Sequence, residues 1–203
     1  MPETVADLLK SKAVVWVAPA GETIPDETSV AYGGTWGGNW VKLGFTKEPL
    51  AVLYEFDEAE LEVEQYLGPV KRRKINEHIT LETVLSETTA LNLAYVTGGV
   101  AADVTSTAAG AAQKAFESLV VGNDPILTEW AVGFEGVHYD ATAVSQPVRI
   151  FLDKATINVN GALEFSQKND DYTGIPLQVK GLANTASSGR MFNWQRVTAA
   201  ATS

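Results

Sequence analysis

The 203-residue chain contains no cysteine and only two histidines, His78 and His138. Disulfide frameworks, thiolate metal sites and cysteine nucleophiles are therefore excluded. The apolar runs fall short of the roughly 18 residues that span a bilayer. The first ten residues also lack the basic and apolar regions of a secretory signal. These absences fit assembly in a reducing cytoplasm, and we expect no membrane partner.

Patterns typical of enzymes are missing as well. Neither histidine belongs to a set of Asp, Glu and His residues with metal-ligand or triad spacing, and there is no Gly-x-Ser-x-Gly elbow. The glycine-rich segment "GGTWGG" at 33–38 lacks the Lys-Ser/Thr pair that completes a phosphate-binding loop. We therefore predict no catalytic residues, no metal and no cofactor.

Positive charge is scarce, because 15 Lys and Arg residues stand against 25 Asp and Glu residues and leave a net charge of −10. Such a chain repels nucleic acid, since affinity for DNA comes mainly from cations that neutralise phosphates. Solubility is an equally good explanation of the same charge. Hydrophobic residues make up 45% of the chain, so the composition is that of a globular protein.

What the sequence does contain is alternation of apolar and polar residues, which predicts β-strands. The predicted strands cover residues 13–19, 40–46, 49–56, 57–66, 75–87, 113–122, 126–137, 146–159, 161–168 and 174–183. One helix is predicted at 88–99, with Thr88 or Thr89 as its cap and Gly98 as its left-handed stop. We therefore expect a mainly β protein: a β-sandwich or barrel with one flanking α-helix, an extended hairpin and long loops.

We expect one domain over residues 1–203, with a hairpin arm at about 55–76 and a C-terminal arm at 184–203. The segment 100–112 is rich in small residues and is predicted to be an exposed loop. The C-terminal arm carries three large apolar side chains, those of Met191, Phe192 and Trp194. It is predicted to dock either on a partner or on its own domain.

The hairpin arm carries two blocks of opposite charge. Glu58, Glu60, Glu62 and Glu64 alternate with Ala59, Leu61 and Val63, and Lys71, Arg72, Arg73 and Lys74 follow shortly afterwards. A catalytic pair of carboxylates needs two different environments, which a uniform row does not provide. A straight strand also does not converge its side chains on a calcium ion as a loop does. A solvated strand face and a surface that meets a charged partner remain as interpretations.

A contact between copies would account for both charge blocks. If the basic cluster lies at the hairpin tip, the tip of one copy can meet acidic residues of the next copy. Opposite charges across an interface fix its register, and head-to-tail contacts generate rings or filaments. The alternative for the basic cluster is an ordinary solvated loop.

Several segments, in their order and spacing across about residues 12–183, resemble the major tail tube protein of long non-contractile-tailed bacteriophages. They are "VVWVAPAGETIPDE", "GGNWVKLGFTKE", the acidic run into "PVKRRK", "ITLETVLSETTALNLAYVTGG" and "GIPLQVKGLA". The resemblance implies a structural, non-enzymatic subunit with a β-sandwich or barrel and a flanking helix. Six copies would form a ring, and stacked rings would form a hollow tube for DNA delivery.

The resemblance also implies partners and a location. A tape measure protein would lie inside the tube, and tail terminator and distal tail proteins would lie at its ends. DNA would pass through without specific binding. The sheets of six copies would join into one inner barrel, and a hairpin or loop would reach the neighbouring ring. The protein would belong to the virion tail after assembly in the host cytoplasm.

On this basis we expect an acidic channel lining and a basic contact between subunits. The lining is predicted to draw on Glu58, Glu60, Glu62, Glu64, Glu82, Glu129 and Glu135, and the contact on Lys71, Arg72, Arg73 and Lys74 at a hairpin tip. DNA carries about one charge per 1.7 Å of axis, and repulsion acts over a Debye length of about 8 Å at physiological salt. A row of carboxylates would therefore keep DNA from adhering to the wall of a narrow channel.

Two other classes of protein also fit the composition. One is a binding module, an immunoglobulin-like or adhesin-like β-sandwich that uses the Gly/Trp loop 33–40 for a ligand. The other is a glycoside hydrolase that uses paired carboxylates on a β-sandwich.

Overall fold

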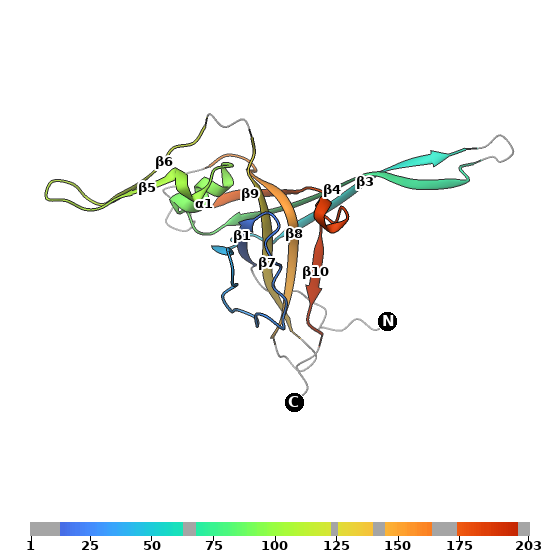
Figure 1. Ribbon diagram of the computed structural model, residues 1–203, viewed down its shortest axis with the longest axis horizontal. Helices are drawn as coiled ribbons and strands as arrows, with labels where there is room; N and C mark the ends of the chain where they lie inside the picture. The colour runs from blue at the N-terminus through green and yellow to red at the C-terminus, as the bar shows by residue number, and fades with distance from the viewer. Residues whose placement is uncertain (1–12, 63–67, 123–125, 140–144, 164–173, 199–203) are drawn as a thin grey trace.

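The fold is a single large antiparallel sheet with a small second sheet and one short helix, in a computed structural model (Figure 1). The structure describes residues 13–62, 68–122, 126–139, 145–163 and 174–198. The large sheet has the order β2-β1-β7-β8-β9-β4-β3, with β10 paired to β8. Its strands are β1 Val14–Pro19, β2 Val41–Phe45, β3 Ala51–Leu61, β4 Lys71–Leu85, β7 Glu129–Tyr139, β8 Ser145–Val159, β9 Ile175–Gly181 and β10 Asn193–Arg196.

The large sheet curls until β2, the first strand in its order, meets β4. A barrel is therefore enclosed by six strands: β2, β1, β7, β8, β9 and β4. Thr46, just after β2, forms an antiparallel bridge with Leu85 at the end of β4. Backbone hydrogen bonds join the same two strand ends, because Ser86 N donates to Phe45 O at 2.8 Å and Lys47 N donates to Val84 O at 2.6 Å. Closure of this kind removes the exposed edges of the barrel itself, whereas β3 lies beyond β4 at the end of the sheet.

Alternating side chains of these strands fill the barrel. The main core takes Val15, Val17, Leu43, Ile79, Leu81, Leu85, Val132, Phe134, Leu152, Ile157, Leu177 and Val179. The period of two in strand geometry sends every second side chain inward, so the barrel strands bury the alternate apolar residues of their sequence. The expected mainly β fold with one packed helix is confirmed.

Helix α1, Ala90–Val96, packs on the barrel through the main core. The Thr89 side chain accepts a hydrogen bond from Asn92 N at 3.1 Å, and Gly98 adopts a φ of 84°. Both features match the predicted cap and stop. The Tyr95 ring lies edge-on to Trp130, with 4.9 Å between ring centroids. This contact anchors a helix that is too short to be stable alone.

A second apolar cluster covers the outer side of β1, β7 and β8. It is made by residues 20–40, which we call the strap. Trp36 stacks on Trp16 with 4.9 Å between ring centroids, and it also contacts Trp40 and Phe151. Gly133 lies under the Trp36 ring, where an added Cβ atom would overlap ring atoms. The absence of a side chain at this position is therefore what lets the ring pack on the sheet.

Two hairpin arms extend from opposite sides of the barrel (Figure 1). The β3–β4 arm includes the two strands predicted at 49–56 and 57–66, which form one strand as far as Leu61. The other arm joins β5 Val104–Thr107 to β6 Phe116–Leu119. The prediction of a plain loop at 100–112 is therefore wrong, because Ala101–Asp103 forms a 3-10 turn and β5 follows it. Four alternating residues are too few to stand out among alanines and glycines.

The C-terminal segment docks on its own subunit. After a 3-10 turn at Thr185–Ser187, β10 pairs with Val148–Phe151 of β8. Met191 and Phe192 pack against the main core, so the second of the two predicted alternatives applies to them. Residues 161–163 form no strand, and the rest of the strand predicted at 161–168 lies outside the described residues.

Candidate functional site

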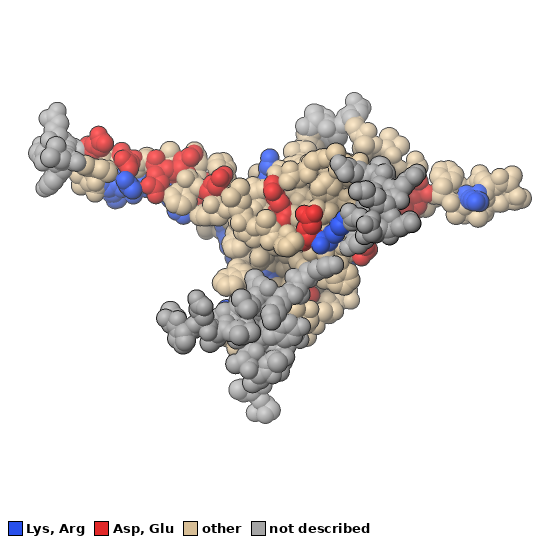
Figure 2. All heavy atoms as spheres, turned by 180° about the vertical axis from the view of Figure 1, so that it is seen from behind, with Lys and Arg blue, Asp and Glu red and all other residues tan. Residues whose placement is uncertain are grey.

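The charges on one face of the β3–β4 arm are paired within the arm. The register places Glu58 opposite Lys74 and Glu60 opposite Arg72, after a bulge between Asp57 and Glu58. Arg72 Nε lies 2.8 Å from Glu60 Oε1, and Arg72 Nη1 lies 4.0 Å from Glu58 Oε2. Figure 2 shows acidic residues along one edge of this arm and basic residues along the other.

Lys74 is held by an exposed aromatic pair on the same face. Its Nζ donates to Tyr54 Oη at 2.6 Å and to Glu77 Oε1 at 2.9 Å, and it lies 4.7 Å from the centroid of the Phe56 ring. The hydrogen bond to Tyr54, followed by the contact with Glu77, raises the pKa of Lys74. The hydrogen bond from Lys74 in turn lowers the pKa of Glu77.

The basic cluster is divided between the two faces of the arm. Lys71 and Arg73 lie opposite Leu61 and Ala59 on the second face, and no ion pair involves either cation among the described residues. All four cations belong to β4 and so lie beside the hairpin tip. This corrects their predicted position at the tip itself.

The outer face of β4, β9 and residues 154–159 of β8 carries mainly polar side chains, none of which is buried; we call it the open face. Register places Glu82, Gln178 and Asn158 in one row and Thr80, Lys180, Thr156 and Glu129 in the next. The Gln178 amide donates to Glu82 Oε1 at 2.6 Å, and Lys154 Nζ lies 2.9 Å from Glu129 Oε2. Both carboxylates therefore have partners in the subunit.

The structure separates the seven glutamates predicted to line a channel. Glu82 and Glu129 lie on the open face, and Glu58 and Glu60 lie on the arm with Arg72. Glu62 is exposed just beyond β3, while Glu64 lies outside the described residues. Glu55 is exposed on the arm, opposite His78 and on the same side as the open face. Glu55 is not among the residues predicted from the sequence, because its parity is opposite to that of the glutamate row.

Glu135 does not belong to any acidic surface of the subunit. Its side chain is 2% exposed, and its Oε1 accepts from both Arg149 Nε at 2.9 Å and Arg149 Nη2 at 2.8 Å. Arg149 Nη2 also donates to Val30 O at 2.7 Å, which ties the strap to the sheet. This corrects the prediction for Glu135: β7 is covered on both faces, so its polar parity does not face solvent.

The described residues contain no group of side chains arranged as a metal site. No group of three His, Asp or Glu residues in this part of the chain could hold a metal ion. No described helix has both the length and the apolar character to cross a membrane. Trp36 and Trp40 of the strap are buried in its cluster with the sheet. The two tryptophans of the loop 33–40 are therefore not exposed to bind a ligand, which weighs against the interpretation as a binding module.

The described residues form a β-barrel subunit with two projecting arms that carry exposed charged and apolar side chains. A family model described as "Phage tail tube protein" matches residues 6–202. The chain therefore belongs to the phage tail tube protein family, and it is a structural component of the virion tail, not an enzyme. No curated protein matches the sequence.

Proposed function

We propose that six copies form a ring and that rings stack into a hollow tube that delivers DNA through a long non-contractile tail. The whole chain acts as one tail tube domain. The observation that carries the proposal is the contrast between the two outer faces of the barrel: the strap covers β1 and β7, whereas the open face of β4 and β9 has no buried side chain. The open face turns toward the channel.

Sheet edges support this arrangement. The β3 strand pairs only with β4 among the described strands, so its other edge keeps its backbone donors and acceptors for a neighbour. An exposed edge of 11 residues is a template for pairing with another chain. A ring that joins the sheets of six copies satisfies these groups and produces a continuous inner wall.

The proposed lining is mixed in charge. Glu55, Glu82 and Glu129 supply the carboxylates, while Lys154 and Lys180 supply the cations, and Lys154 is already paired with Glu129. DNA is kept from adhering because few cations remain to neutralise phosphates. A tape measure protein occupies the tube before DNA does, and terminator and distal tail proteins close its ends. Assembly takes place in the host cytoplasm.

Electron microscopy of the purified protein tests the assembly. Negative staining is expected to show rings with sixfold symmetry and hollow rods of uniform diameter. A protein that stays monomeric across salt, pH and concentration would contradict the proposal, as would solid fibres without a bore.

Charge reversal tests the lining separately. Tubes of a Glu82→Lys, Glu129→Lys variant should still form but should retain DNA in a co-sedimentation assay at physiological salt. Glu48→Lys, an exposed change in the loop before β3, is the control and should leave DNA binding at the wild-type level. Equal DNA retention by both variants would place the lining on another face.

A further inference from the structure

Most exposed large apolar side chains of the described residues gather in two places. The β3–β4 arm carries Val52, Leu53, Tyr54, Phe56, Leu61, Val70 and Ile75, and the β5–β6 arm and its base carry Phe116, Val120, Val121, Ile126 and Leu127. The two arms point away from opposite sides of the barrel (Figure 1). Apolar exposure of this extent marks interaction surfaces, and the two groups cannot meet within one copy.

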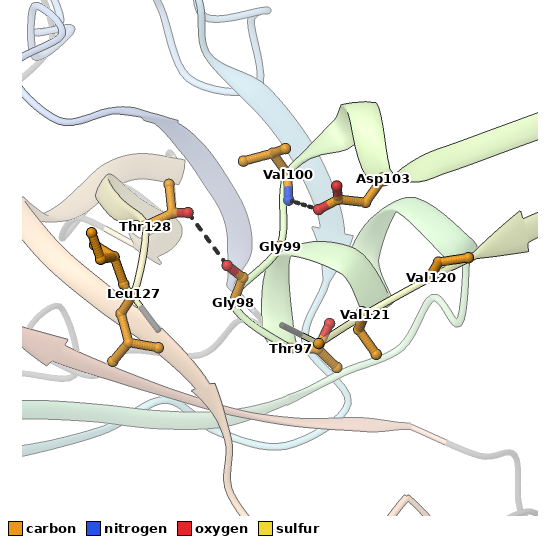
Figure 3. Close-up of a pocket in the computed structure, with 11 residues that line it drawn as sticks. Thr97, Gly98, Gly99, Val100, Asp103, Val120, Val121, Leu127 and Thr128 are labelled. Carbon is orange, nitrogen blue, oxygen red and sulfur yellow. Dashed lines mark hydrogen bonds between the residues drawn. The ribbon is translucent and has the colours of Figure 1, made fainter. Parts of the chain in front are cut away.

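Val120, Val121, Ile126 and Leu127 of the second group line a hollow of about 190 Å³. Figure 3 shows Val120, Val121 and Leu127 beside the turn that follows α1. Thr128 donates to Gly98 O at 3.3 Å, and the Asp103 carboxylate accepts from Val100 N at 2.8 Å, so the walls are held by hydrogen bonds. The hollow has room for a branched apolar side chain.

The charges around the two groups are complementary. Asp103 lines the hollow, and Glu117 is exposed on β6, a few residues before Val120 of the hollow lining. On the β3–β4 arm, Lys71 and Arg73 flank Leu61 on the second face, whereas Arg72 and Lys74 are paired inside the arm. Two cations next to an exposed leucine therefore match two carboxylates next to an exposed apolar hollow.

We propose that the end of the β3–β4 arm of one copy docks in the hollow at the base of the β5–β6 arm of a second copy. Leu61 or Val70 enters the hollow, and Lys71 and Arg73 meet Asp103 and Glu117. This inference rests on the proposed tube, because the contact is head-to-tail and such contacts propagate into rings or filaments. It names the partner surface of the arm, which the tube proposal leaves open.

The absence of cysteine allows a direct test by disulfide trapping. Copies that carry Leu61→Cys are mixed with copies that carry Val121→Cys and are oxidised under assembly conditions. A disulfide needs Cα atoms within about 7 Å, so a cross-linked dimer is expected only if the arm meets the hollow. Leu61→Cys mixed with Tyr32→Cys, an exposed position on the strap, is the matched control and should give no dimer.

Charge exchange gives a second readout. Lys71→Glu with Arg73→Glu should abolish the trapped dimer and the growth of tubes, and adding Glu117→Lys to the same chain should partly restore both. Arg72→Gln, a change on the paired face, should leave trapping intact. Absence of the dimer in the first mixture, or undiminished trapping in the reversed variant, overturns the inference. Trapped dimers in the first mixture, together with a wild-type protein that forms no hollow tubes, would instead overturn the proposed function.

Discussion

The barrel with its strap, which we call the body, and the β3–β4 arm each contain an arginine–glutamate ion pair. The closest N···O distance is the same in both pairs, but their surroundings differ. Arg149–Glu135 and Arg72–Glu60 both have a closest approach of 2.8 Å. The body pair has side chains that are 2% exposed, and the arm pair has side chains that are 60% and 41% exposed. Geometry alone therefore does not set the value of an ion pair; desolvation does.

The difference suits the roles of the two regions. The body pair joins the strap to the sheet, and removing either partner leaves a charge without compensation in the interior. The arm pair lies in water, where screening and side-chain entropy leave it little net stabilisation. It pairs charges on one face of the arm, whereas Lys71 and Arg73 on the other face are the cations of the proposed docking contact.

Loss of the body pair should have the largest effect. Arg149→Ala leaves the Glu135 carboxylate buried without its partner, which costs about 3–5 kcal/mol of unfolding free energy. Denaturant unfolding measures it. The double variant Arg149→Met, Glu135→Leu should recover most of the loss, because apolar replacement of a whole buried pair is often neutral. An equally unstable double variant would mean that Val30 and the strap depend on the guanidinium itself.

Overpacking of the sheet beneath the strap should have the second largest effect on stability. Gly133→Ala places a Cβ atom in the Trp36 ring, and overpacking of this kind costs about 1–3 kcal/mol. The loss should appear in thermal unfolding together with a change in tryptophan fluorescence. Gly21→Ala is unsuitable as a control because of its φ of 88°, whereas Gly37→Ala in open space should change neither signal.

Removal of the arm pair should have a much smaller effect. Arg72→Ala should lower the free energy of unfolding by less than about 1 kcal/mol, as exposed pairs do. The same denaturant titration used for Arg149→Ala provides the measurement. A loss comparable to that of Arg149→Ala would remove the contrast between arm and body.

The pH dependence of the Lys74 contacts should be the smallest effect. The pKa of Glu77 is lowered in the folded arm, so its contribution is present above its unfolded pKa and is lost as pH falls through the lowered value. The pKa of Lys74 is raised, so its contribution is lost only as pH rises through that raised value. Side-chain NMR titration of Glu77 should show a lowered pKa in the wild-type protein. The pKa should return toward its ordinary value in the Lys74→Met variant.

Much of the fold was accessible from the sequence. The strands predicted at 13–19, 40–46 and 174–183 correspond to β1, β2 and β9, and the helix and its cap were predicted at the observed residues. Local geometry carries these signals, because strand period and capping depend on neighbours in the chain. The β5 strand was missed because its four residues follow a run of small side chains.

The candidate surfaces were less accessible. Alternation separated Glu58 and Glu60 from Ala59 and Leu61, but it could not show that Arg72 would lie opposite Glu60. Nor could it show that Arg149 would bury Glu135, since these residues meet through the register of β7 and β8. The hollow near Asp103 joins segments from two sides of the β5–β6 arm, and no local pattern marks it.

The sequence by itself determined most of the strands, the helix and the two sides of those strands, because backbone geometry repeats every two residues in a strand. Only the tertiary structure decided which side is covered and which carboxylates keep a cation beside them. Those outcomes depend on strand order, on the bulge between Asp57 and Glu58, and on a strap that folds back over the barrel. All three are set by contacts between segments that are distant in the chain.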